Sequence, residues 1–423
     1  MSHQYREIDR TCDVAIVGGG TAGLTAALAA VKGGGRVIIY EKMARPGLRL
    51  MASGGGRCNL SNTLDAESFM ARFGRRGRFI QPALAALDSK ALRQMLKRLG
   101  VPTFSPDGLH VYPVSESGAD VQRALMQASI RSGVCIHVDC AVTALVLRGR
   151  RLAGLETTRG VIRCPRVIVA TGGLSYVPLG GGESGYELAR QAGHVIAPPR
   201  PALVPLITRE KWPASCAGAT LPEVELRLAP KGTHTVTTRG ALLFTHRGLS
   251  GPAALDLSGA VSDRLQDGGP VPAFLNLSPG LRPVDWIKRL DEWPQAGGRR
   301  MVLKWLDGFL PRSVAEALIG VAGLPRDLTA ARLSRTQRKA LGDHLAAWPL
   351  TLTGTEGFEH AMVTRGGVRL EEINPRTLES RRVSGLYFAG EVVDLDGPCG
   401  GFNLQWAFSS GHLAGLAAAG DKL

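Results

Sequence analysis

The apolar positions near the start of the chain form two continuous runs, separated by glycines and by a helical repeat. The first run, "DVAIV" (13–17), has the uninterrupted apolar character of a strand that is buried on both faces. "GGGTAG" (18–23) leads into the helical pattern "LTAALAAV" (24–31), and "RVIIYE" (36–41) is a second buried strand. This order predicts a strand–turn–helix–strand unit, which is half of a dinucleotide-binding fold.

The rest of the first 200 residues alternates between helical and strand patterns. A helix is expected at 89–99, with Asp88 or Ser89 as its N-cap. The turn "SPDG" (105–108) is expected to join two short strands. The same patterns predict a second helix at 120–132 and strands near 134–138, 142–148 and 166–173.

The pattern changes at Pro198 and resumes its first character near residue 361. Prolines open a strand-rich region, and the helical patterns that follow it are expected to be capped or broken at Pro294, Pro311 and Pro325. We therefore predict an α/β fold with a dinucleotide-binding domain at 1–197 and 361–423, interrupted by a β-rich domain at 198–283 and 350–360 and by a helical subdomain at 284–349.

Gly18, Gly20 and Gly23 form the spacing G-x-G-x-x-G between the first strand and the first helix. The first glycine permits a tight turn, the second allows a pyrophosphate to approach, and the third allows close helix–strand packing. Glu41 ends the next strand, where an acid accepts hydrogen bonds from ribose hydroxyls and disfavours a 2′-phosphate. The motif therefore predicts FAD or NAD rather than NADP.

The C-terminal stretch 385–411 indicates which of these two nucleotides is bound. A strand delivers Gly390 and Glu391 to a site edge, and Gly400 and Gly401 open a helix. A helix N-terminus aimed at a flavin ring would stabilise the negative charge that develops there on reduction, and a nicotinamide would have no use for it. Because "GGGESG" (180–185) does not directly follow a strand, we expect one resident cofactor.

The segment "SGGGRCNLSN" (53–62) is open to three interpretations: a phosphate cradle, a reactive thiol, or a flexible loop with a buried cysteine. The pyrophosphate already has its turn at 18–23, and no other cysteine lies within forty residues of Cys58. The interpretation that remains is a glycine loop with a buried cysteine, and we expect its backbone to lie close along the flavin.

These segments resemble the bacterial BaiN-like FAD-dependent oxidoreductases, a family that includes an aminoacetone oxidase and a bile-acid dienone reductase. "SGGGRCNLSN", "ATGGLSYVPLGGGESGYELA" and "GEVVDLDGPCGGFNLQWAFSSG" stand in the expected order, although Arg49 and Cys399 replace the usual Lys and Thr. The resemblance implies a Rossmann-like FAD-binding domain of glutathione-reductase type. By position it assigns to FAD Gly18, Gly20, Thr21, Ala22, Gly23, Glu41, Lys42, Arg49, Ser53, Gly54, Gly55, Gly56, Arg57, Asn59, Ala170, Thr171, Gly172, Gly390, Glu391, Gly401, Phe402, Asn403 and Leu404.

Five side chains are weak candidates for catalysis: His110, Tyr112, Tyr176, His246 and Cys399. The histidines stand in turns, the tyrosines are possible proton donors, and the cysteine precedes a helix whose field would lower its pKa. For each of them a packing or hydrogen-bonding role is the simpler alternative. No metal-ligand spacing is present, so we expect no metal site.

The formal charge of +15 has two explanations, a solvated basic surface or a patch that attracts an anionic ligand. Residues 1–100 hold sixteen Lys and Arg against seven Asp and Glu, and "RFGRRGR" (72–78) has four arginines. No aromatic-rich basic motif is present, so a nucleic-acid partner is not the first expectation. Seven cysteines without C-x-x-C spacing and the absence of a signal peptide favour a cytoplasmic protein that does not enter a membrane.

The resemblance implies hydride transfer between flavin N5 and a small organic substrate, an amine or an enone, with oxygen or transient NAD(P)H in the other half-reaction. The alternative is a flavoprotein that binds or modifies nucleic acid, such as tRNA, through its basic surface. A flavin-bearing interaction protein without turnover is the third possibility. The oligomeric state is not predicted.

Overall fold

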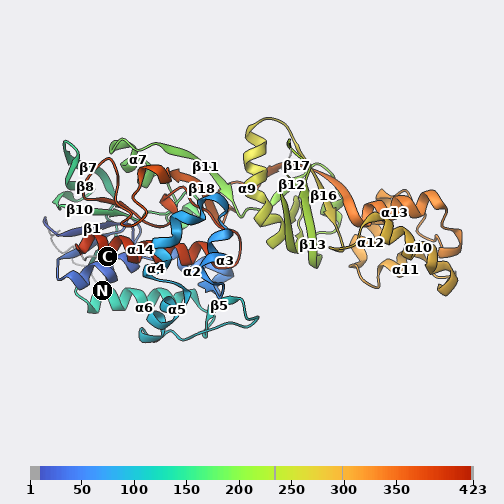
Figure 1. Ribbon diagram of the computed structural model, residues 1–423, viewed down its shortest axis with the longest axis horizontal. Helices are drawn as coiled ribbons and strands as arrows, with labels where there is room; N and C mark the ends of the chain where they lie inside the picture. Colours follow the sequence, from blue (N-terminus) through green and yellow to red (C-terminus); the bar gives the residue numbers. More distant parts are fainter. Residues whose placement is uncertain (1–9, 233–234, 298, 421–423) are drawn as a thin grey trace. The chain divides into compact units, whose positions relative to one another are not determined.

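The structure, a computed structural model, describes residues 10–232, 235–297 and 299–420. Two segments far apart in the sequence, up to Arg200 and from Met362 onward, form the first unit, and Pro201–Ala361 forms the second. Each unit has its own cluster of buried hydrophobic side chains, so each is described by itself (Figure 1).

A five-stranded parallel sheet lies at the centre of the first unit, in the order β19-β10-β1-β2-β6. Its central strands are buried along their whole length, as their continuous apolar runs predict. The final strand of the chain, β19, pairs with β10, so the sheet contains strands from both ends of the sequence. The strands are β1 (Val14–Val17), β2 (Val37–Tyr40), β6 (Cys135–His137), β10 (Arg166–Val169) and β19 (Leu386–Phe388).

Two helices from opposite ends of the chain, α1 (Thr21–Ala30) and α14 (Phe402–Ala419), pack closely against each other (Figure 1). A methyl group on Gly411 would lie 2.2 Å from the carbonyl oxygen of Ala22, and one on Gly415 would lie 2.3 Å from that of Ala26. Both distances are far inside van der Waals contact, so the two backbones can approach this closely only because both positions are glycine.

The remaining elements of the first unit surround this core. The predicted helix at 89–99 is confirmed as α5 (Ser89–Arg98), and the Asp88 side chain accepts a hydrogen bond from the Ala91 amide at 2.7 Å as its N-cap. The other elements are α2 (Leu48–Ala52), α3 (Ala66–Ala71), α4 (Gln81–Ala86), α6 (Gly118–Arg131) and α7 (Ser184–Gln191), with strands β3 (Ser61–Asn62), β4 (Thr103–Phe104), β5 (His110–Pro113), β7 (Val142–Arg148), β8 (Arg151–Thr157), β9 (Gly160–Arg163), β11 (Ile196–Ala202) and β18 (Val363–Val368).

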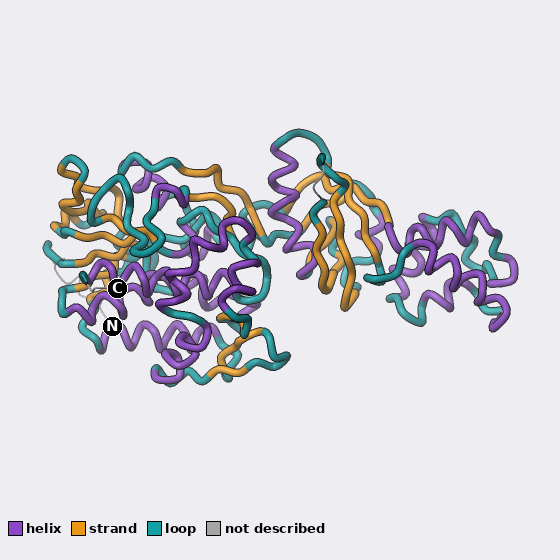
Figure 2. Tube along the Cα trace, in the orientation of Figure 1, coloured by secondary structure: helices purple, strands orange, loops and turns teal. Residues whose placement is uncertain are grey.

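The second unit combines a closed six-stranded barrel with a group of helices (Figure 2). Barrel and helices share one hydrophobic cluster, in which the rings of Trp212 and Trp348 stack with their centroids 3.8 Å apart. The strands are β12 (Leu206–Thr208), β13 (Thr220–Leu228), β14 (Thr237–Phe244), β15 (Gly248–Ser250), β16 (Val271–Asn276) and β17 (Trp348–Thr355), and the helices are α8 (Trp212–Ser215), α9 (Pro252–Gln266), α10 (Pro283–Gly297), α11 (Val302–Leu306), α12 (Arg312–Val321) and α13 (Arg335–Ala347).

One predicted helix break is wrong. Pro294 lies inside α10, which continues to Gly297. The preceding part of this helix buries Trp286, Leu290 and Trp293. The burial of two indole rings and a leucine outweighs the loss of one backbone hydrogen bond near the end of the helix.

Replacing Gly411 with Ala should force α1 and α14 apart, because the added methyl group would overlap the Ala22 carbonyl. We expect a loss of about 1–3 kcal/mol in the free energy of unfolding, as for other overpacked cores. Urea denaturation followed by circular dichroism measures it. Gly320→Ala in α12 is the matched control, because no atom lies within 4 Å of the added methyl group. Equal stability of the two variants would contradict the close packing.

His412 in α14 should make stability depend on pH. Burial, helped by the charge of Lys32, lowers the pKa of His412 to about 4. In the unfolded chain a histidine has a pKa near 6.5. As the pH falls from about 6.5 to about 4, the unfolded state therefore gains a proton that the folded state does not bind, and the free energy of unfolding decreases. His412→Gln should lose less stability than the wild type between pH 7 and pH 5 in urea denaturation. Equal losses in the two proteins would rule out this assignment.

Candidate functional site

The turn between β1 and α1 has the geometry of an anion cradle. A methyl group on Gly18 would lie 2.7 Å from the Ala170 carbonyl oxygen, and one on Gly23 would lie 1.9 Å from that of Gly18. At Gly20 the space is open, with no atom within 4 Å. No side chain caps α1, and its first turn has no acidic residue. The first amides of the helix, at Thr21 and beyond, are therefore directed at the space where a phosphate would bind.

Glu41 lies beside this turn at the end of β2. Its carboxylate accepts hydrogen bonds from the Gly19 amide at 2.7 Å and from the Met43 amide at 2.8 Å, and the residue is only 8% exposed. Its neighbour Lys42 is exposed, with its ammonium nitrogen 3.1 Å from the position of a methyl group on Gly182. The carboxylate is thus held at the mouth of the phosphate turn.

A polar cluster includes residues that follow the C-terminal ends of β10 and β19. Glu391 accepts hydrogen bonds from Arg49 at 2.5 Å, from the Ser175 hydroxyl at 3.1 Å and from the Thr364 amide at 2.6 Å. The Arg49 side chain also lies against Gly172, where an added methyl group would be 2.6 Å from a guanidinium nitrogen. The side chains of the ion pair are 23% and 18% exposed. Three distant segments therefore converge on one carboxylate.

The segment 53–56 adopts a left-handed backbone at three successive glycines. Gly54, Gly55 and Gly56 have φ values of 58°, 66° and 91°. At Gly55 and Gly56 no atom lies within 4 Å of an added methyl group, so the backbone conformation, and not crowding, requires glycine there. The loop closes on itself where the Cys58 amide donates to the Ser53 carbonyl at 3.0 Å.

Cys58 is fully buried, and burial raises the pKa of its thiol to about 11. Arg57 and Asn59, which flank Cys58 in the sequence, contact different parts of the first unit. Arg57 pairs with Glu116 and lies over the Tyr112 ring at 4.9 Å. Asn59 lies 2.9 Å from the Ser61 carbonyl oxygen and 3.2 Å from the Gly401 amide nitrogen, and in the orientation that satisfies both it joins the glycine loop to α14.

The N-terminus of α14 closes the site. A methyl group on Gly401 would lie 2.4 Å from the Ser61 carbonyl oxygen, and no side chain caps the helix. Asn403 exchanges hydrogen bonds with the amide and carbonyl of Gly397 at 2.8 and 2.9 Å. Phe402 is turned into the core, its ring centroid 4.8 Å from that of Phe69, and Leu404 is half-buried.

His110, one of the candidate proton donors, lies beside this helix N-terminus. Its Nδ1 atom lies 2.5 Å from an Asp107 carboxylate oxygen, and this hydrogen bond lowers the pKa of Asp107. Its Nε2 atom lies 3.3 Å from the position of a methyl group on Gly400. The side-chain Nδ2 atom of Asn62, a residue opposite His110 in the β3–β5 pair, donates to the Gly400 carbonyl at 3.0 Å. The imidazole is thus fixed beside the turn that begins α14.

The other candidates are placed differently. Cys399 is half-buried and directly precedes Gly400, and Tyr176 is half-buried in a left-handed conformation before a short 3₁₀ turn. His246 is exposed between β14 and β15 of the second unit. Within the described ranges no group of three or more His, Cys, Asp or Glu side chains is placed to hold a metal ion, and no helix is long and apolar enough to cross a bilayer.

Comparison with known proteins establishes the family. The model of the HI0933-like protein Rossmann domain matches residues 12–417. The chain belongs to the HI0933-like family. A relative from Clostridium scindens, the 3-dehydro-bile acid delta(4,6)-reductase, is 33% identical over 96% of this chain and 98% of its own length. The ribosomal RNA dihydrouridine synthase of Haemophilus influenzae is 32% identical over 95% of this chain and 97% of its own length.

Solved structures show the same fold for this HI0933-like chain. The 3-ketosteroid delta1-dehydrogenase of Sterolibacterium denitrificans superposes with a TM-score of 0.55 and 12% identity, covering 98% of this chain and 100% of that one. At this identity the likeness concerns the fold alone. Together, the family match, the superposition and the sheet topology confirm the predicted α/β architecture, a Rossmann-like domain with an inserted β-rich domain.

Sequence patterns identified Arg49 and Glu391 separately, and the HI0933-like fold joins them. Ser175 and Thr364 were not predicted. Ser175 stands two residues after the strand predicted at 166–173, which ends in two glycines. A polar residue just after such a strand end was a usable signal. Thr364 contributes a backbone amide, which any residue except proline has, so no local pattern identifies it.

Replacing Glu391 with Gln should destabilise the first unit, because Arg49 would face an amide nitrogen in place of a carboxylate oxygen. We expect a loss of about 2 kcal/mol, since hydrogen bonds to charged groups are worth about 1.5–3 kcal/mol. Urea denaturation measures it. Arg49→Lys is the matched variant, because it keeps the positive charge, and it should lose less. A larger loss in Arg49→Lys than in Glu391→Gln would contradict the pairing as the source of stability.

Proposed function

We propose that this HI0933-like chain is an FAD-dependent reductase of a carbon–carbon double bond conjugated to a carbonyl group. The observation that carries this proposal is the Asp107–His110 pair beside the N-terminus of α14, with Nε2 directed at Gly400. The names of two relatives support it, because a delta(4,6)-reductase and a dihydrouridine synthase both add hydrogen to a carbon–carbon double bond.

The residues present fit FAD. Gly18, Gly20 and Gly23 leave an uncapped helix N-terminus open for the pyrophosphate, and Glu41 is available to the ribose beside it. Arg49 and Glu391 would hold the ribityl chain, and the glycine loop 53–56 would lie along the ring. Bound FAD would supply hydride from N5 of its ring. The uncapped N-terminus of α14 would stabilise negative charge on the ring by its amides and dipole.

The contribution of His110 is a proton. Reduction of a conjugated double bond adds a hydride to the β-carbon and a proton to the α-carbon, so a positioned acid is required. Asp107 accepts the Nδ1 hydrogen, which leaves Nε2 as the atom that would carry the transferred proton. Asp107 is thus the orienting group and His110 the acid.

The direction of reaction determines the other half-reaction. A reductase consumes two electrons per turnover, so NAD(P)H would be the donor. Oxygen would serve as the acceptor only if the chain instead oxidised an amine. Anaerobic mixing with NADH or NADPH, followed by an enone, tests the reductive direction, and purified protein that is colourless and takes up no FAD would refute the proposal.

Nucleic acid is a second candidate substrate. The first unit holds 32 of the 51 Lys and Arg residues against 21 of the 36 Asp and Glu residues. The double bond of a uracil ring is itself conjugated to a carbonyl, so the same chemistry applies. If the substrate is nucleic acid, its binding should weaken steeply with added salt, whereas the binding of an uncharged enone should not depend on salt in this way.

His110→Gln should slow reduction of the double bond by about 10²–10⁴-fold, the usual contribution of a general acid. The rate of flavin reduction by NAD(P)H should remain unchanged, because that step needs no proton from His110. Single-turnover stopped flow separates the two steps. His246→Gln is the control, because this histidine is exposed in the second unit. A wild-type rate of double-bond reduction in His110→Gln would assign the proton to another group.

A further inference from the structure

The first unit has a pocket of about 660 Å³ that contains none of the residues assigned to FAD. It lies among α3, α4, α5 and β4, and Gln405 of α14 contributes to its lining. Leu64, Phe69, Leu84 and Pro102 supply its apolar lining. Small-molecule sites are of about 300–1,000 Å³ and are mostly apolar with a few polar groups, and this pocket fits that description.

Two residues that line this pocket each have a buried side-chain oxygen with no hydrogen-bond partner among the described residues. These oxygens are the amide oxygen of Gln405 and the hydroxyl oxygen of Ser89. Gln405 is 0% exposed, and its amide nitrogen is already used, donating to the Leu87 carbonyl at 2.9 Å and to the Ser409 hydroxyl at 2.8 Å. Buried polar groups in proteins are normally paired, so these two indicate a ligand that offers an N–H donor and an acceptor.

Three cations stand on one face of α5 at the pocket rim. Lys90, Arg93 and Lys97 are three and four residues apart, which aligns them along the helix. In the described chain no ion pair is formed by any of them, and Arg93 donates to the Thr103 hydroxyl at 3.0 Å.

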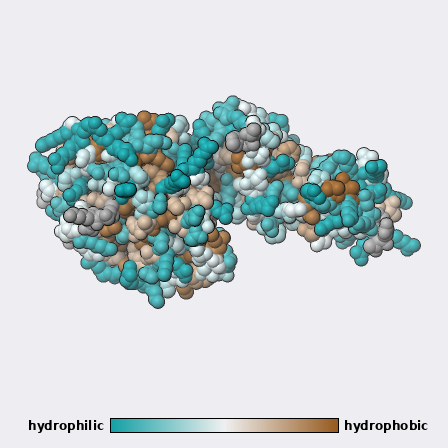
Figure 3. Space-filling view, in the orientation of Figure 1, coloured by the Kyte–Doolittle hydropathy of each residue, from teal (hydrophilic) through white to brown (hydrophobic). Residues whose placement is uncertain are grey.

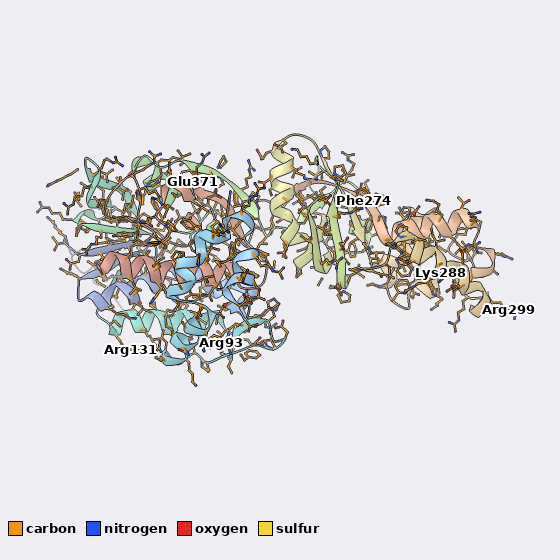
Figure 4. All side chains as sticks on the ribbon, viewed as in Figure 1. Arg93, Arg131, Phe274, Lys288, Arg299 and Glu371 are labelled. Carbon is orange, nitrogen blue, oxygen red and sulfur yellow. The ribbon has the colours of Figure 1, made fainter. Side chains whose placement is uncertain are left out.

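The rim also contains two carboxylates. Asp65 and Asp88 each accept a hydrogen bond from a backbone amide at 2.7 Å as helix N-caps, and these two carboxylates stand against the three cations. Figure 3 shows hydrophilic and apolar residues side by side on the viewed face of the first unit. Figure 4 labels Arg93 of this rim. The rim therefore keeps an excess of positive charge.

We propose that this pocket is a nucleotide-binding site, separate from the FAD site. The base would lie on the apolar lining, with an N–H group donating to Gln405 and a carbonyl oxygen accepting from Ser89. The ring of a uracil offers both groups, and so does the carboxamide of a nicotinamide. The phosphate would bind to Lys90, Arg93 and Lys97. A simple carboxylic acid lacks the N–H donor, and a steroid lacks the phosphate. Two sources supply this chemistry, a free dinucleotide electron donor and the nucleotides of an RNA chain. The binding site does not depend on the proposed reduction.

Calorimetric titration of the FAD-loaded protein tests this site with three probes: uridine 5′-monophosphate, NADP⁺, which cannot reduce the flavin, and a short oligouridine RNA. The double variant Lys90→Ala, Lys97→Ala should bind about tenfold more weakly, because two phosphate contacts are lost. Its matched control is Arg98→Ala, Arg131→Ala, which removes the same charge from exposed residues outside the pocket. The control should change affinity less than about twofold.

Ser89→Ala tests the base contact, and about fivefold weaker binding is expected from the loss of one hydrogen bond. Ser89→Ala removes only one oxygen atom. It therefore tests the base contact even if a substitution at the fully buried Gln405 disturbs folding. Tighter binding of the RNA with a steep salt dependence would identify RNA as the source, and tighter binding of NADP⁺ would identify the dinucleotide electron donor.

Equal weakening in the two double variants, or no binding of any probe at millimolar concentration, would overturn the proposal. Binding is measured without turnover. A site that binds nucleotides in a protein that reduces no double bond would therefore refute the proposed function and leave this inference standing.

Discussion

The close packing of α1 against α14 is the contact on which the rest of the first unit depends. Gly411 and Gly415 bring the two helix backbones together at Ala22 and Ala26. Farther along α14, Trp406 donates to the Gly390 carbonyl at 3.1 Å, and the Gly390 amide donates to the Ser410 hydroxyl at 2.9 Å. One helix therefore holds both the phosphate turn and the strand end that carries Glu391.

The site is built mainly from backbone. Its phosphate turn, its left-handed loop at 53–56 and the start of α14 all rely on glycines, and few side chains enter the space between them. Backbone amides at helix ends carry fixed partial charges that need no rearrangement when a ligand's charge changes. Side chains such as Asn59 and Asn403 tie the loops to each other and to the helix.

Two relatives of similar identity are named for reactions on very different molecules, a bile acid and ribosomal RNA. The bond that is reduced can be chemically alike in both, whereas the rest of the substrate is not. Specificity must therefore come from surfaces outside the flavin site. In this chain the basic excess of the first unit and the pocket beside α5 are the surfaces that we propose for this role.

The sequence by itself determined the local elements and the cofactor turn, because apolar periodicity, caps and glycine spacing act over a few residues; the N-cap at Asp88 is an example. It misjudged Pro294, where burial of Trp286 and Trp293 outweighs a local rule. Only the tertiary structure joined Arg49, Ser175, Thr364 and Glu391, and only it left the Gln405 oxygen unpaired inside a pocket. These contacts link residues up to 342 positions apart, and no local pattern encodes such a distance.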